Sequence, residues 1–340
     1  MTIRAVLDHI DSNLPKSLSR LLELLRIESI STDPAFKDQC IKAADWLVSD
    51  LKSIGFQAEK RKTPGHPMVV AHHKGTGPQF LFYGHYDVQP IDPIKLWNSP
   101  PFLPTVENTN NGQVIRGRGS SDDKGQLMTF VEACRAWKSV YKKLPAKVSI
   151  LFEGEEESGS PSLIPFLKNN SAELKSSIAL ICDTGLYDND TPGIVTSLRG
   201  TVGIELEIIG PNKDLHSGKY GGLSTNPIRV LTKILTGLHD DNGKITLPGF
   251  YDGVSEISDE LRKQWESLSF NETKFLNDVG LSEPAGEKGR TALEMLWARP
   301  TCDVNGISGG YQGEGFKTVI ASKASPKVFT QFSDITLHTP

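Results

Sequence analysis

Apolar residues recur at helical spacing at the start of the chain. Leucines stand at positions 18, 21, 22 and 25 within Ser17–Ile27, and Ile41–Leu51 repeats this spacing before Gly55. Residues three or four positions apart share one face of a helix. The pattern therefore predicts two amphipathic helices that open the chain.

Three short apolar runs predict buried strands at Phe80–Tyr83, Val148–Phe152 and Ile178–Cys182. A further helix is predicted between the first two runs, from Lys124 through Trp137. Strands that alternate with helices are typical of a mostly parallel, doubly wound α/β sheet. Ligands bind such a sheet beyond the carboxyl ends of its strands, so we expect the chemistry there.

The pattern changes near Ser197. Apolar residues alternate with polar or small ones over Val202–Ile208, as in a strand with one solvated face, and a helix is predicted over Pro227–Leu238. These features predict a second, two-layer α+β domain, with domains at residues 1–196 and 197–340. The polar, irregular stretch Asp240–Gly289 indicates no function.

Composition and charge narrow the class of partner. A net charge of −4 and a pI near 6.1, with no Lys/Arg-rich tract, offer no basic surface for nucleic acid or an anionic membrane. We therefore expect a small-molecule partner. The N-terminal segment has neither signal-peptide nor transmembrane character, which predicts a cytoplasmic protein. The widely spaced Cys40, Cys134, Cys182 and Cys302 form no CxxC pair and are expected to be reduced thiols.

A histidine ends the first predicted strand. Asp87 follows His85 by two residues. This arrangement suits a metal ligand whose imidazole is oriented by a nearby carboxylate. Turns and core histidines share the pattern, so it does not identify a metal site by itself.

Asp122 lies in the glycine-rich loop Arg116–Gly125, just before the third predicted helix. One interpretation is a flexible loop with an Asp that caps the helix. The other is that the glycines bring Asp122 close to a cation, where its two oxygens can bridge two metal ions.

An acidic segment, Glu153–Ser160, follows the second strand, and Asp183 follows the third. Acidic residues in the first turn of a helix complement its dipole, which is the ordinary explanation. Adjacent carboxylates repel, however, unless a cation or a shared proton offsets their charge. A metal ion would account for the cluster.

The ends of three successive strands thus carry one histidine and three or four carboxylates. Nitrogen and oxygen ligands without thiolates suit a pair of zinc ions, although manganese or cobalt can substitute. No P-loop, Rossmann glycine fingerprint or Gly-x-Ser-x-Gly elbow stands at a strand end, which excludes the main rival chemistries.

With these motifs in order, the sequence resembles the di-zinc peptidases and deacylases that include carnosinase, cytosolic non-specific dipeptidase, aminoacylase and succinyl-diaminopimelate desuccinylase. The matching segments are Gly84–Pro90, Gly117–Gly125, Glu153–Ser160 and Asp214–Gly218 with Gly221–Gly222. The resemblance runs from about Leu18 to about Val328, and the long forms of the last three motifs favour the dipeptidase branch.

The resemblance implies a catalytic domain with an inserted lid and dimerisation domain, and it implies metal-dependent hydrolysis of dipeptides or short peptides. One zinc would take His85 and Asp183, the other would take Glu157, and Asp122 would bridge them. Asp87 would orient His85. The remaining implied roles fall to three residues: Glu156 as general base, His216 of the lid as oxyanion donor, and Arg299 as the ligand of the substrate carboxylate.

The resemblance ends before the family's plan is complete. The family's second zinc takes a last ligand from a histidine farther along the chain, whereas Phe329–Thr336 departs from the pattern and His338 lacks the family context. We therefore expect an incomplete lid, an absent return segment of the catalytic domain, and a chain that holds one zinc tightly. A weakly active or inactive dimeric relative and an N-acyl-amino-acid deacylase remain alternatives to the dipeptidase. Substrate side-chain preference is not predicted.

Overall fold

The computed structural model describes residues 2–110, 112–188, 191, 193–195 and 197–332. The chain divides into two compact units, Met1–Gly193 and Ile194–Pro340, which are described separately below. The sequence departs from the family pattern over Phe329–Thr336, and the part of this stretch after Phe332 lies outside the described residues, as does His338.

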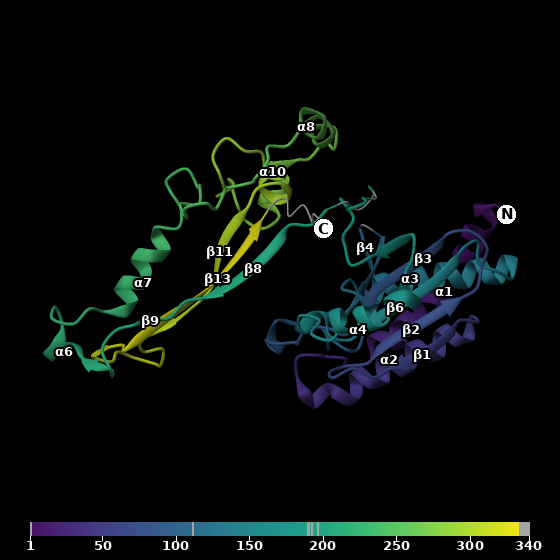
Figure 1. The fold of residues 1–340 in the computed structure, drawn as a ribbon, viewed down its shortest axis with the longest axis horizontal. Coiled ribbons are helices and arrows are strands. Elements are labelled where there is room, and N and C mark those ends of the chain that lie inside the picture. Colours follow the sequence, from purple (N-terminus) through teal and green to yellow (C-terminus); the bar gives the residue numbers. More distant parts are fainter. Residues whose placement is uncertain (1, 111, 189–190, 192, 196, 333–340) are drawn as a thin grey trace. The chain divides into compact units, whose positions relative to one another are not determined.

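Unit 1 is an α/β unit built around one sheet (Figure 1). Its α-helices are α1 (Ile3–Leu25), α2 (Lys37–Ser53), α3 (Lys124–Tyr141), α4 (Leu163–Asn169) and α5 (Ser171–Leu174). Its strands are β1 (Gln57–Arg61), β2 (Met68–His73), β3 (Gln79–His85), β4 (Thr105–Thr109), β5 (Gly112–Arg116), β6 (Lys147–Glu153) and β7 (Ile178–Ile181). Short 3-10 helices lie at Pro34–Phe36, Ile94–Leu96 and Glu156–Ser158.

The main sheet has the strand order β1-β2-β6-β3-β7. β3 pairs in parallel with β6 and β7, whereas β1–β2 and β2–β6 are antiparallel. The α/β prediction is confirmed, but the sheet is mixed rather than mostly parallel. The cause is the β1–β2 hairpin, which the sequence pattern did not predict and which joins the sheet beside β6.

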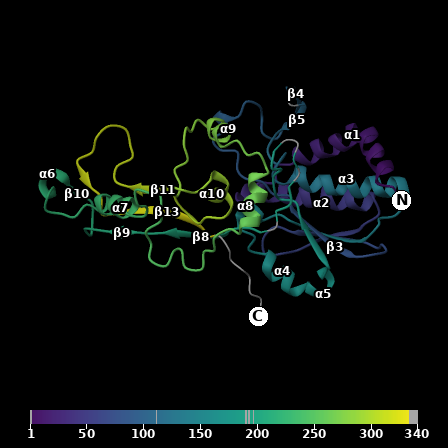
Figure 2. The same cartoon turned by 90° about the horizontal axis from the view of Figure 1, so that it is seen from above.

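Helices cover both faces of this sheet. Figure 2 shows α1, α2 and α3 on one side and α4 and α5 on the other. The larger core joins the first three helices to one sheet face, and a smaller core packs Phe166 and Leu174 against Met68, Val70 and Leu151 on the other face. The predicted opening helices, the third helix and the strands at β3 and β6 are confirmed.

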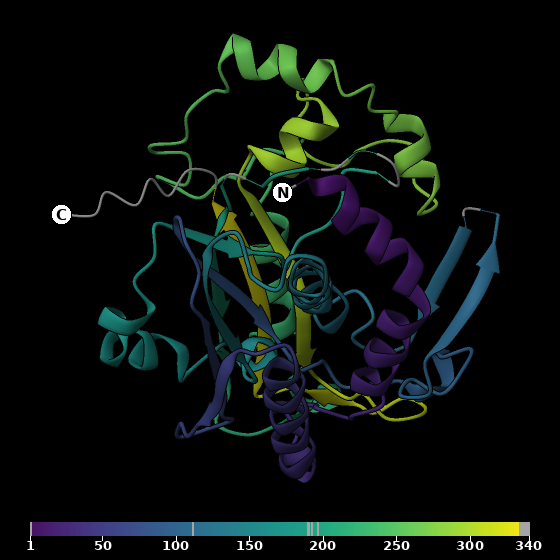
Figure 3. The same cartoon turned by 90° about the vertical axis from the view of Figure 1, so that its right-hand side faces the viewer.

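The third predicted strand is present but less buried than expected. Ile178 and Ile181 of β7 are exposed, because among the described residues β7 pairs only with β3. The hairpin of β4 and β5, blue in Figure 3, forms a separate two-stranded ribbon.

Unit 2 is a two-layer α+β unit. Its helices are α6 (Ser217–Tyr220), α7 (Pro227–Thr236), α8 (Asp259–Glu266), α9 (Glu272–Asn277) and α10 (Ala292–Trp297). Its strands are β8 (Gly200–Glu205), β9 (Ile208–Ile209), β10 (Leu215–His216), β11 (Thr301–Gly309), β12 (Val319–Ile320) and β13 (Lys323–Phe332). The antiparallel sheet β11-β13-β8 packs through Cys302 and Val328 against Leu235 and Leu238 at the end of α7.

The structure also bears on the cysteines and on the membrane character of the chain. All four cysteines are free thiols, and three of them are buried. Among the described residues no helix is long and apolar enough to cross a membrane.

Candidate metal centre and catalytic residues

The sheet brings the candidate residues of unit 1 to one edge. In the parallel pairing of β3 with β6, His85 lies opposite Glu153, so both strands end at the same level. β7 ends at Ile181, and Asp183 follows two residues later. Parallel strands present their carboxyl ends at one edge, which is why residues far apart in sequence meet here.

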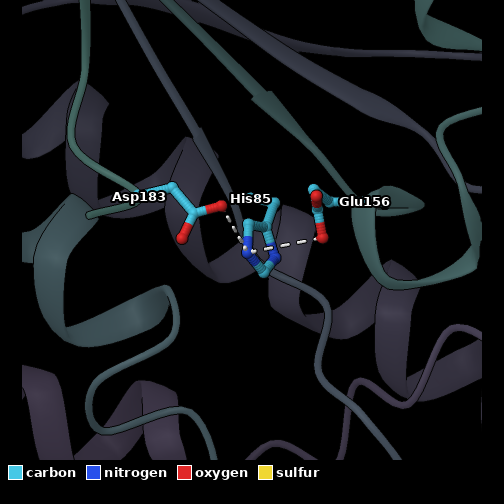
Figure 4. Close-up of side chains that lie close together, drawn as sticks. All are labelled: His85, Glu156 and Asp183. Atoms are coloured by element: carbon cyan, nitrogen blue, oxygen red, sulfur yellow. Dashed lines mark ion pairs between the residues drawn. The ribbon is translucent and has the colours of Figure 1, made fainter. Parts of the chain in front are cut away.

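His85 is the centre of this cluster. Its ring is completely buried, and its Nε2 lies 2.9 Å from Asp122 Oδ1, 3.6 Å from Asp183 Oδ2 and 4.0 Å from Glu156 Oε2. Figure 4 shows His85, Glu156 and Asp183 pointing toward one another. Atoms of these three side chains lie within 4.8 Å of one another, so they can hold one metal ion.

Asp87 orients two parts of the cluster at once. Its backbone carbonyl lies 3.1 Å and its Oδ1 lies 3.3 Å from His85 Nδ1. Because a carbonyl only accepts hydrogen bonds, Nδ1 carries the proton and Nε2 is the ring nitrogen available to a metal. The buried Asp87 carboxylate also accepts hydrogen bonds from the backbone N–H groups of Glu156 (3.3 Å) and Glu157 (3.1 Å). Asp87 therefore fixes the turn of Glu156 and Glu157 relative to His85.

Burial separates the four glutamates of the acidic segment into two pairs. Glu153 accepts hydrogen bonds from the hydroxyls of Tyr83 and Ser160, and Glu155 accepts them from the backbone N–H groups of His66 and Ser162. Both carboxylates are buried and hold the segment in place. Glu156 and Glu157 are half-buried and remain available for chemistry.

Glu157 lies apart from the Nε2 cluster. Its Oε2 accepts a hydrogen bond of 2.6 Å from Gln89 Nε2. Burial raises the pKa of Glu157, the hydrogen bond from Gln89 lowers it, and the negative charge of Asp122 raises it again. The two carboxylates are therefore close enough to repel. Gln89, which belongs to the same motif as His85, was not predicted to contribute.

The charges at this edge are poorly balanced. Burial raises the pKa of Glu156 and of Asp183; the charge of His85 lowers both, and neighbouring carboxylates raise them again. Burial lowers the pKa of His85, but the hydrogen bond with Asp87 and the charges of Asp87, Asp123 and Asp183 outweigh it and raise that pKa to about 10. Carboxylates that gather around one imidazole, with no Lys or Arg of the described residues bonded to them, form a set that a divalent cation would neutralise. The residues present therefore fit a metal ion with nitrogen and oxygen ligands.

His216 of unit 2 has a defined ring orientation. Its Nδ1 accepts a hydrogen bond of 3.0 Å from the Gly218 N–H, and its Nε2 lies 3.3 Å from Thr318 Oγ1. Since a backbone N–H can only donate, Nε2 carries the proton of the neutral ring. The residue therefore presents a hydrogen-bond donor.

Arg299 is buried within unit 2. Its guanidinium pairs with Glu287 at 3.0 Å and with Glu256 at 3.5 Å, and it stacks 5.4 Å from the Tyr251 ring. A substrate carboxylate would have to compete with Glu287 for this side chain, which is a cost that the sequence did not reveal.

Comparison with known proteins places this geometry in a family. The sequence model described as Peptidase family M20/M25/M40 matches residues 81–328, which include every candidate residue of both units. The chain belongs to peptidase family M20/M25/M40. The resemblance inferred from the motifs is confirmed.

Individual relatives in the M20 family support the dipeptidase branch. The Cys-Gly metallodipeptidase DUG1 of Candida albicans is 30% identical over 344 residues, which cover 96% of this chain and 70% of the relative. The human Beta-Ala-His dipeptidase is 26% identical, with 96% and 67% covered.

Solved structures agree with the fold of these M20 proteins. The Sulfolobus solfataricus metallo-carboxypeptidase Sso-CP2 matches with a TM-score of 0.82 and 34% identity, covering 93% of this chain and 71% of that one. The Saccharomyces cerevisiae dipeptidase Dug1p matches with a TM-score of 0.84 and 26% identity, covering 99% and 73%. The predicted combination of a catalytic domain with an α+β lid is that of these proteins.

Proposed function

We propose that this chain hydrolyses the peptide bond of dipeptides or short peptides in a metal-dependent reaction. The observation that supports this most directly is the convergence of Asp122, Asp183 and Glu156 on the Nε2 atom of His85, in a member of an M20 peptidase family. Relatives named as dipeptidases support the substrate class.

The proposed ligands are divided between two zinc ions. His85, Asp122 and Asp183 would hold one ion, and Glu157 with Asp122 would hold the other. Asp122 suits a bridge because its carboxylate is exposed, contacts His85 and repels Glu157. Bound zinc supplies a Lewis acid that polarises the scissile carbonyl and lowers the pKa of water.

Glu156 is the proposed general base. Its carboxylate oxygen would take the proton of the attacking water and transfer it to the nitrogen of the leaving amine. In unit 2, the Nε2–H of His216 would donate to the oxyanion that develops on the carbonyl oxygen.

We also propose a homodimer formed through unit 2. β8 pairs on one side only among the described residues, and its Val202 and Ile204 are exposed. An open strand edge with apolar side chains is a surface on which a second chain can pair. The mass of the protein in solution tests this point.

Metal removal tests the proposed function. The purified chain should cleave Cys-Gly and β-Ala-His, the dipeptides in the relatives' names, and should lose this activity after dialysis against a chelator. Zinc or manganese should restore it, because the carboxylates at the site bind cations rather than act alone. Hydrolysis that persists in the metal-free chain would contradict the proposal. Cleavage of N-acetyl amino acids in preference to dipeptides would instead favour the deacylase.

A further inference from the structure

Asp123, next to the proposed bridging ligand, has a completely buried carboxylate. Its Oδ2 accepts a hydrogen bond of 2.9 Å from the backbone N–H of His85. Its Oδ1 is buried and has no hydrogen-bond partner in the part of the chain that the structure describes. The side chain thus connects the Asp122 turn to the last residue of β3.

The hydrogen bond to His85 replaces the helix-capping hydrogen bond that the sequence suggested for this loop. An Asp at the start of α3 is expected to cap the helix, and Asp123 does occupy the N-cap position. Its side chain makes no capping hydrogen bond and turns instead toward β3. A buried carboxylate with one unpaired oxygen destabilises a fold, whereas an apolar side chain of similar size would not. Local features that oppose stability are concentrated at functional sites.

The surroundings hold Asp123 in place. A Cβ atom added to Gly84 would lie 2.7 Å from Asp123 Oδ2, so the carboxylate packs directly on the β3 backbone. Lys124, the next residue in the chain, is fully buried and donates from Nζ to the carbonyl oxygens of Leu24 in α1 (3.3 Å) and of Ile27 just after it (2.7 Å). Asp122 itself is exposed, and its Oδ1 contacts His85 Nε2.

We propose that Asp123 is a positioning residue that sets the distance between His85 and Asp122, two of the three proposed ligands of one metal ion. Asp123 accepts a hydrogen bond from the backbone N–H of His85 and follows Asp122 directly in the chain. This inference rests on the proposed metal-dependent function. Loss of an outer partner that positions a ligand typically weakens metal binding by about 10-fold to 100-fold.

Zinc affinity of the full chain, measured by competition with a chromophoric chelator, tests the proposal. Asp123→Ala should weaken zinc binding by about 10-fold to 100-fold. Asp123→Asn keeps an acceptor oxygen for the His85 N–H and should retain most of the affinity. Val131→Ala, at a buried position within α3, is the matched control: it should lower the unfolding temperature without changing zinc affinity.

The outcomes separate this proposal from the proposed function. Zinc binding by Asp123→Ala that equals the wild type would overturn the positioning role. Equal loss in Asp123→Asn and Asp123→Ala would overturn it too, because charge rather than geometry would then matter. If Asp123→Ala fails to fold by circular dichroism, Gly84→Ala replaces it, since the added Cβ displaces the same carboxylate; unchanged affinity there would contradict the proposal. A wild-type chain that binds no zinc would defeat the proposed function itself.

Discussion

Glu156→Gln is expected to retain its metal and to lose about 10²-fold to 10⁴-fold in kcat, the range for removal of a general base. The substitution keeps the size of the side chain, and it keeps the hydrogen bond from the backbone N–H of residue 156 to the Asp87 carboxylate. Only the ability of the carboxylate to take a proton is removed. Steady-state hydrolysis of a dipeptide and elemental analysis of the same preparation measure the two effects.

Glu157→Gln is the matched control for this variant. The neighbouring glutamate is proposed as a ligand, so its replacement should lower metal content at one site as well as activity. Glu156 also lies within 4.0 Å of His85 Nε2, in the group that can hold a metal ion. If Glu156→Gln loses metal and Glu157→Gln keeps it, the two roles have been assigned in reverse.

Asp122→Ala is expected to remove most of the bound metal and, with it, the activity. A bridging carboxylate serves both ions, so its loss should weaken zinc binding by more than the roughly 10-fold to 100-fold cost of losing an outer partner. The side chain is 61% exposed, so the fold should not depend on it. Chelator competition measures the affinity, and thermal unfolding of the metal-free protein checks the fold.

Asp45→Ala supplies the control, because Asp45 is similarly exposed, at 58%, and pairs with Lys60 at the surface. This variant should bind metal as the wild type does. An Asp122→Ala protein with unchanged metal stoichiometry would show that Asp122 is not a ligand.

The sequence predicted the elements whose apolar pattern is continuous. The runs in β3 and β6 and the leucine spacing of α1 are dictated by burial, and burial is visible in the sequence. β2 was missed although its first four residues are buried. Its apolar run is short, and no recognisable motif follows it. β1 is mostly polar, since it is the outer strand of the sheet as far as the described residues show, and no periodicity revealed it.

Within the site, the sequence identified residue types but could not sort neighbours. Four glutamates between Glu153 and Glu157 look alike in sequence, and only the fold shows which pair is buried. Only the family resemblance separated Asp122 from the adjacent Asp123, and the fold adds that their side chains contact different parts of His85. The ion pair of Arg299 with Glu287 depends on packing across a loop, which leaves no local signal.

Anomalous diffraction at the zinc absorption edge, from crystals of the zinc-loaded protein, tests the central claim most directly. We predict an anomalous peak about 2.0–2.1 Å from His85 Nε2, with carboxylate oxygens of Asp122 and Asp183 completing the site. Zinc bound elsewhere, for example at the surface cluster of His72 and Glu173, with no peak beside His85, would contradict it.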